Sequence, residues 1–249
     1  MAAAKGRTAR RVLLGSAAVA VAWLGAVWPP PVWWRTHEPR CTAMMRERDD
    51  CVRRRPARPS ARQLAVLERM VIIAEDSRFR THHGIDFIEL REALADGSGR
   101  GASTITQQLA KNLYLSPSRN PLRKLKEATT AARLELALSK DRIMELYLGV
   151  AEWGPGVWGA AAASAAYYGV TPDRLSAEQA AALAATLPHP RSSNPAYRPG
   201  RMLARRSLIL ARYFGGRAAV PRAVEDEEPL EVPEIPPFEL PEIPLVHQP

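Results

Sequence analysis

The run GASTITQQLAKN, residues 101–112, is hard to place in an ordinary folded domain. Ile105 and Leu109 are its main apolar side chains, so it is too polar for a core helix; Lys111 is its one charge, so it is a poor solvated surface. Taken alone, the run indicates a polar loop. If it is helical, spacings of three and four residues place four polar side chains on one face: Thr104, Gln107, Gln108 and Lys111. Such a face suits the wall of a site for a polar, anionic ligand.

Acidic side chains stand on both sides of this run. Upstream, Glu75 belongs to AEDSRFRTHHG (74–84), whose arginines favour an ionised carboxylate that can act as a general base. Downstream, Glu127 belongs to RKLKEATTAARLE (123–135), where its i,i+4 spacing from Arg123 could equally indicate a surface salt bridge. Cations at a helix start form a natural diphosphate site, and five precede Glu127: Lys111, Arg119, Arg123, Lys124 and Lys126. Paired carboxylates beside such a site indicate acid–base chemistry at a glycosidic centre with a diphosphate leaving group.

Histidine and cysteine give no metal-binding pattern. His82 and His83 are adjacent, so their side chains diverge, and no third ligand has suitable spacing; we therefore expect a structural or orienting role for His82. Cys41 and Cys51 follow a candidate membrane span. In an oxidising compartment they either pair across a short loop or remain two unrelated thiols.

Charge is unevenly spread over the 249 residues. Residues 1–62 carry a net +9, residues 63–222 a net +8 and residues 223–249 a net −8. The middle block is basic in its own right, which indicates an anionic partner such as nucleic acid, anionic lipid or phosphate. The outward-facing topology inferred next and the lack of interleaved aromatic residues argue against nucleic acid.

The N-terminal region predicts a membrane protein. Residues 12–28 form an uncharged run of about the minimum length for a transmembrane anchor, and the basic residues within 1–11 predict a cytoplasmic N-terminus. The alternative is a cleaved signal peptide. We favour a retained anchor, because the segment 24–26 is a poor cleavage site and the tryptophans at 28, 33 and 34 suit the outer interface.

Beyond the span, the pattern predicts three further segments. Residues 29–59 predict a membrane-proximal linker, and residues 60–217 an all-α domain with no strand. Caps and apolar spacing predict five helices in that domain: 60–76, 120–138, 139–153, 176–187 and 202–213. The caps are Ser60 with Gln63, Asn120 before Pro121, Ser139, and Ser176 with Gln179; in the third helix one apolar face holds Ile143, Met144, Tyr147 and Leu148. Residues 218–249 are acidic and Pro-rich, which predicts a disordered or extended tail that solvates the chain end or, less favoured, binds a partner.

Four motifs, in this order and spacing, resemble a known family: EDSRFRTHHG, GASTITQQLAKN, RKLKE and KDRIMELYLGVAEWGPGVWG. The chain is similar over about residues 60–215 to the peptidoglycan glycosyltransferases, which polymerise lipid II and include one half of the class A penicillin-binding proteins. The resemblance implies a lysozyme-like α-helical domain with a small membrane-facing lobe. No Ser-x-x-Lys or Lys-Thr-Gly motif follows, so we expect the monofunctional biosynthetic peptidoglycan transglycosylase type, without transpeptidase activity.

The resemblance also implies residue roles. Glu75 would deprotonate the 4-hydroxyl of the acceptor lipid II, which attacks the anomeric carbon of the growing chain, inverts it and expels undecaprenyl pyrophosphate. Glu127 would organise the donor diphosphate, and Lys111, Arg119 and Lys126 would bind it. The expected substrate cleft is lined by Asp76, Phe79, His82, Gly84, Ser103, Thr104, Gln107, Gln108, Asn112, Arg123 and Lys124, with Phe79 serving packing rather than chemistry.

The implied setting is the outer side of the cytoplasmic (inner) membrane, with one membrane pass. The expected partners are lipid II, the growing glycan chain, the membrane, separate transpeptidases and division or elongation proteins, and not nucleic acid. No cofactor is expected to be required, although a divalent cation (Mg or Mn) held weakly and partly by substrate would assist the diphosphate.

Two positions depart from the family pattern. Gly149 stands where Asn is usual, and Val170 where Lys is usual. They are the only support for an inactive membrane-anchored binding protein. A lytic muramidase is the other alternative, but a hydrolase needs no diphosphate clamp, so the cations argue against it.

Overall fold

The computed structural model describes residues 2–51, 61–96, 101–118, 120–217 and 220. Most of them are helical, which confirms the predicted fold class in its main feature. Arg119 lies outside the described residues, and so does the predicted tail at 218–249, apart from Val220.

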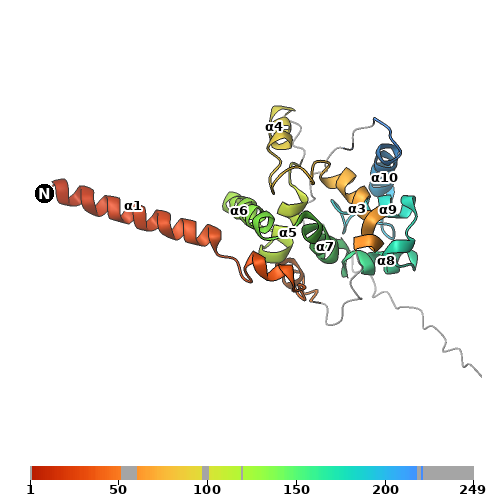
Figure 1. Ribbon diagram of the computed structural model, residues 1–249, viewed down its shortest axis with the longest axis horizontal. Coiled ribbons are helices and arrows are strands. Elements are labelled where there is room, and N and C mark those ends of the chain that lie inside the picture. The colour runs from red at the N-terminus through yellow and green to blue at the C-terminus, as the bar shows by residue number, and fades with distance from the viewer. Residues whose placement is uncertain (1, 52–60, 97–100, 119, 218–219, 221–249) are drawn as a thin grey trace, which may run out of the picture.

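The N-terminal helix α1 (Ala2–Gly25) projects from the body of the protein beside α6 (Pro121–Ala137) (Figure 1). It begins earlier than the predicted span at 12–28 and ends before it, so the basic N-terminal residues share one helix with the apolar run. Within the described parts of the chain, no helix combines the length and apolar character needed to cross a membrane. The structure therefore does not support the predicted transmembrane anchor.

Helix α5 (Ile105–Tyr114) holds the run that opened the sequence, and it lies between α6 and α7 (Lys140–Val150) (Figure 1). Ile105, Leu109 and Ala110 are fully buried, so the few apolar residues of this run suffice to fix the helix in the core. Its polar residues are buried with it, which requires internal hydrogen bonds.

A second group of helices packs beside α5–α7: α3 (Ala61–Glu75), α8 (Ala160–Tyr168), α9 (Ala177–Thr186) and α10 (Gly200–Tyr213). Helix α9 begins at the predicted capping box of Ser176 and Gln179. Its alanines are buried without bulky side chains, which lets α3 and α10 approach it closely. Helix α4 (Phe87–Asp96) stands apart in Figure 1, and η2 (Pro172–Arg174) is a short 3-10 turn against α3.

In the described residues of the domain, the structure departs from the all-α prediction at a two-stranded hairpin. This hairpin replaces the predicted end of the helix at 139–153. Helix α7 ends at Val150, and β1 (Glu152–Gly154) pairs antiparallel with β2 (Val157–Trp158), Glu152 opposite Trp158. The segment Gly154-Pro155-Gly156 is turn-forming, and Gly156 has φ +72°, so the chain reverses here instead of continuing the helix.

Residues 29–51 are the described part of the segment 29–59 that was predicted as a membrane-proximal linker. They form η1 (Pro31–Arg35) and α2 (Ala43–Glu47), and they bury Trp34, Met44 and Met45 in the core. The Trp34 indole donates to the Tyr114 hydroxyl (2.6 Å). Burial raises the pKa of Tyr114 to about 12, so this hydroxyl stays neutral and donates in turn to the carbonyl of Pro29 (2.8 Å). A few isolated apolar residues give no periodicity, which is why the sequence pattern missed them.

Cys41 and Cys51 form a disulfide with Cα atoms 5.2 Å apart, which settles the alternative left open by the sequence. We expect the double variant Cys41→Ser/Cys51→Ser to lose about 2–3 kcal/mol of unfolding free energy, the loop-closure value for a loop this short. Urea unfolding of both forms measures the loss. A reductant should reproduce it in the natural protein and leave the double variant unchanged; an equal response of both would contradict the prediction.

Gly84 sits where a side chain does not fit. Its φ is +90°, and a Cβ there would lie 3.1 Å from the backbone carbonyl carbon of Ala131 on α6. We expect Gly84→Ala to cost roughly 1–3 kcal/mol of stability, because it adds backbone strain and a clash with backbone. Gly149→Ala is the matched control: Gly149 is helical with nothing within 4 Å of a Cβ, so alanine should be neutral or stabilising. Equal thermal unfolding midpoints for the two variants would refute the prediction.

Candidate active site

Glu75 is the last residue of α3; residues on two other helices bind its carboxylate, and a residue on a third orients one of them. It is 8% exposed. From α5, the Gln108 amide donates to Oε2 (3.0 Å), and from α10 the Arg205 guanidinium donates to Oε1 (3.1 Å) and to the carbonyl of Ala74 (2.6 Å). The Tyr147 hydroxyl on α7 donates to Gln108 Oε1 (2.7 Å), which turns the Gln108 amino group toward Glu75. The carboxylate is therefore fixed in orientation and kept next to a cation.

Asp76 is fully buried and joins the end of α3 to the start of α5. Its Oδ2 accepts from the backbone N–H of Ile105 (3.0 Å), and its carboxylate binds His82 Nε2 (2.9 Å). The backbone N–H of Gly84 donates to His82 Nδ1 (3.2 Å), so His82 links the Asp76 carboxylate to the backbone at Gly84.

Thr104 and Gln107 stabilise the start of α5. Thr104 is the N-cap, and the two residues form a capping box. The Thr104 hydroxyl also donates to the carbonyl of Gly84 (2.6 Å). Of the four residues expected on one polar face, Gln108 binds Glu75, and Lys111 is half-buried on the same helix.

Glu127, on α6, is 2% exposed and lies between two cations. Arg123 Nη1 is 2.8 Å from Oε2, and the Lys124 ammonium binds Oε1. Lys124 also donates to the hydroxyl of Ser103 (2.7 Å), in the segment that leads into α5. The i,i+4 pair is therefore not the exposed salt bridge that spacing alone allowed, because its carboxylate is buried and a second cation shares it.

The structure places the cations around Glu127 in different surroundings from one another. The Lys126 ammonium lies 4.4 Å from the centre of the Trp23 ring on α1, so it faces the N-terminal helix rather than Glu127. Arg123 and Lys124, expected only in the cleft, are the cations at Glu127. Asn112 is buried on α5, and Phe79 is fully buried under the Lys140 ammonium, which agrees with a packing role.

Asp76, His82 and Asp86 each place one ligand atom within 4.8 Å of the others, a grouping that the sequence spacing did not indicate. Each of these groups already has polar partners within the protein. Asp76 holds Ile105 and His82, and the Arg78 guanidinium binds both oxygens of Asp86 (2.8 and 3.0 Å). A divalent cation would have to displace Arg78, so this donor set does not fit one.

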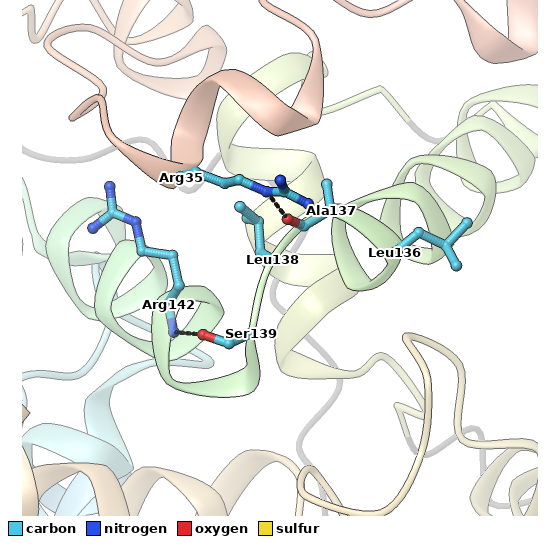
Figure 2. Close-up of a pocket in the computed structure, with 6 residues that line it drawn as sticks. All are labelled: Arg35, Leu136, Ala137, Leu138, Ser139 and Arg142. Carbon is cyan, nitrogen blue, oxygen red and sulfur yellow. Dashed lines mark hydrogen bonds between the residues drawn. The ribbon is translucent and has the colours of Figure 1, made fainter.

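Figure 2 shows a pocket of about 440 Å³ that does not involve the predicted site residues. It is lined by Arg35, Leu136, Ala137, Leu138, Ser139 and Arg142. Arg35 Nε donates to the carbonyl of Ala137 (2.6 Å), and Arg142 donates to the carbonyls of Trp34 (2.7 Å) and His37 (2.8 Å). These arginines fasten η1 and the residues after it to α6 and α7.

The sequence interpretation missed Arg205 and gave Tyr147 no role beyond packing. A signal for Arg205 was present. On α10, Met202 and Ile209 are buried, and Arg205 lies three residues after the first and four before the second. A charged residue on the apolar stripe of a helix needs a buried partner, and Glu75 supplies it.

Comparisons with known proteins identify the family of this chain. The family model described as Transglycosylase matches residues 46–214. A biosynthetic peptidoglycan transglycosylase of Azoarcus sp. (strain BH72) is 41% identical over 81% of this chain and 93% of its own length. Proteins of the same name are 42% identical in Thiobacillus denitrificans, over 83% and 95%, and 41% identical in Bordetella avium, over 73% and 82%. The chain belongs to the transglycosylase family.

Proposed function

We propose that the protein polymerises lipid II into glycan strands by inverting glycosyl transfer. One observation carries the proposal: two buried carboxylates, Glu75 and Glu127, lie on separate helices, and each is held next to a cation. Residues around α5 connect them, through Gln108 on one side and Ser103 on the other. The names of the relatives support peptidoglycan as the product.

On the acceptor side, Glu75 is the general base. It accepts the proton of the acceptor's 4-hydroxyl as that oxygen attacks the anomeric carbon of the growing chain, and the bond to the diphosphate breaks with its electron pair going to the leaving group. The carboxylate has to be ionised at the start, and the adjacent Arg205 favours that form.

On the donor side, charge has to be stabilised on the departing diphosphate. Lys111 and Lys124 are the lysines that we assign to it, with Arg123 and Glu127 fixing the position of Lys124. Lys126 can join them only by leaving Trp23. No cofactor is required; Mg²⁺ or Mn²⁺ would assist by neutralising diphosphate charge while bound mainly to substrate.

The lipid carrier of this substrate places the reaction at a membrane surface, on the outer face of the cytoplasmic membrane. The glycan product is not cross-linked by this chemistry, so separate transpeptidases have to act on it, together with proteins of division or elongation.

Fluorescent lipid II in detergent tests the proposal, with glycan chains resolved on a gel and undecaprenyl pyrophosphate measured in parallel. Polymer formation with release of about one diphosphate per bond is the expected result. Cleavage of purified peptidoglycan without polymer formation would make the protein a muramidase instead. Binding of lipid II with neither outcome would support an inactive binding protein and would overturn the proposal.

A further inference from the structure

Arg205 is a buried cation that the reaction outlined above does not use directly. Its side chain is 10% exposed and it lies 130 residues from Glu75 in sequence. One guanidinium nitrogen, Nη2, reaches both Glu75 Oε1 (3.1 Å) and the carbonyl of Ala74 (2.6 Å). Arg205 therefore binds both the backbone carbonyl of Ala74 and the carboxylate of the next residue, Glu75. These two bonds restrict the rotation of the Glu75 side chain relative to α3.

The two oxygens of Glu75 are consequently in different surroundings. Oε1 accepts from a charged guanidinium, whereas Oε2 accepts from the neutral amide of Gln108 (3.0 Å). A charge-assisted hydrogen bond is the stronger of the two and withdraws more electron density. Oε2 lies on the side of α5, which carries Lys111.

The amide on that side is itself oriented. Tyr147 donates to Gln108 Oε1 (2.7 Å), so Gln108 cannot turn its carbonyl toward Glu75 without losing that bond. The chain of contacts Tyr147–Gln108–Glu75–Arg205, named here the orienting chain, draws one residue from each of α7, α5, α3 and α10. Four helices therefore fix a single carboxylate.

We propose that Arg205 is a positioning residue that holds Glu75 Oε1, so that Oε2 receives the proton of the attacking hydroxyl. Tyr147 orients Gln108, and Gln108 in turn fixes the position of Oε2. The inference rests on the proposed function, because it assumes that Glu75 is the base. A purely structural role is the alternative: a cation at the last turn of α3 stabilises that helix end whatever the chemistry.

The test compares Arg205→Gln, Arg205→Lys and Tyr147→Phe in lipid II polymerisation, with kcat and KM measured across pH. Arg205→Gln is expected to lower kcat about 10- to 100-fold with KM changed less than about twofold, because orientation is lost and substrate binding is not. The acidic limb of the pH profile of its kcat should move to higher pH, because the cation that favours the ionised carboxylate is gone. Arg205→Lys should recover most of the kcat that Arg205→Gln loses, and its acidic limb should lie at the pH found for the natural protein. Tyr147→Phe should lower kcat about 3- to 10-fold with the acidic limb unmoved.

Arg212→Gln is the matched control, seven residues further along α10, where the guanidinium binds the carbonyl of Gly216. It should leave kcat and the pH profile unchanged. A loss of stability in Arg205→Gln with an unmoved pH limb and an unchanged kcat would assign Arg205 to structure and overturn the inference. If Arg205→Gln does not fold, a kcat in Tyr147→Phe equal to that of the natural protein overturns it. If the natural protein makes no polymer, or Glu75→Gln keeps the full rate, the proposed function fails instead.

Discussion

Glu75→Gln is expected to reduce the rate of lipid II polymerisation by about 10²–10⁴-fold, the usual contribution of a general base. Glutamine keeps the shape of the side chain but offers one acceptor oxygen, so it keeps the hydrogen bond from Arg205 or from Gln108 and not both, and it cannot take a proton. The loss should fall on kcat rather than KM, because the proton moves only in the transition state. The measurement is the initial rate of glycan formation under substrate saturation.

Glu68→Gln is the control for this variant. Glu68 lies on α3, seven residues before Glu75. It pairs with Arg80, a residue with no part in the proposed reaction. Its substitution should leave the rate within about twofold and change stability by less than about 1 kcal/mol, as for a partly exposed pair. A Glu75→Gln enzyme that retains more than a tenth of the natural rate would remove Glu75 from the role of base.

The sequence located helices well where their ends carry local signals. Ser176 with Gln179, Ser139, and Asn120 with Pro121 start helices in the structure as predicted. Capping uses side chains within three residues of the helix start, so a single sequence contains it. The apolar face predicted for α7, with Ile143 and Tyr147 among its members, is buried as well.

The failures share a physical cause, which is that the deciding partner is distant in sequence. Lys126 lies within the cation cluster by spacing, yet it packs on Trp23, about a hundred residues earlier. Residues 43–47 form a helix whose methionines are buried against the core, and no pattern inside the segment indicates that partner. Arg205 acquires its role from Glu75, on another helix. Propensity and periodicity describe one element at a time, whereas these roles arise between elements.

The run at 101–112 shows both sides of this limit. Its polarity correctly indicated proximity to a charged site, since Gln108 binds Glu75 and Ser103 binds Lys124. The single polar face was an oversimplification, because Thr104 and Gln107 satisfy the backbone at the start of the helix. Half of the unusual polarity therefore positions α5, and the remainder is available to the chemistry.

Glu127→Gln is expected to lower kcat by about 10²-fold, equivalent to roughly 2.7 kcal/mol of transition-state stabilisation. Glu127 holds the charged groups of Arg123 and Lys124 at its two oxygens, and glutamine, which is neutral and offers one acceptor oxygen, removes the ionic partner of both cations and keeps a hydrogen bond to one of them. The site also gains one positive charge, so inhibition by inorganic pyrophosphate should be as strong as before or stronger while turnover falls.

Glu135→Gln is the matched control for Glu127→Gln, because Glu135 is also buried on α6 and paired with a lysine, Lys140 (2.7 Å). Both variants should lose stability in thermal unfolding, since each disrupts a buried ion pair. Only Glu127→Gln should lose turnover at a temperature where both remain folded. Equal turnover in the two variants would mean that Glu127 acts through stability alone. A fall in turnover with weaker pyrophosphate inhibition would instead mean that its carboxylate is needed to build the anion site itself.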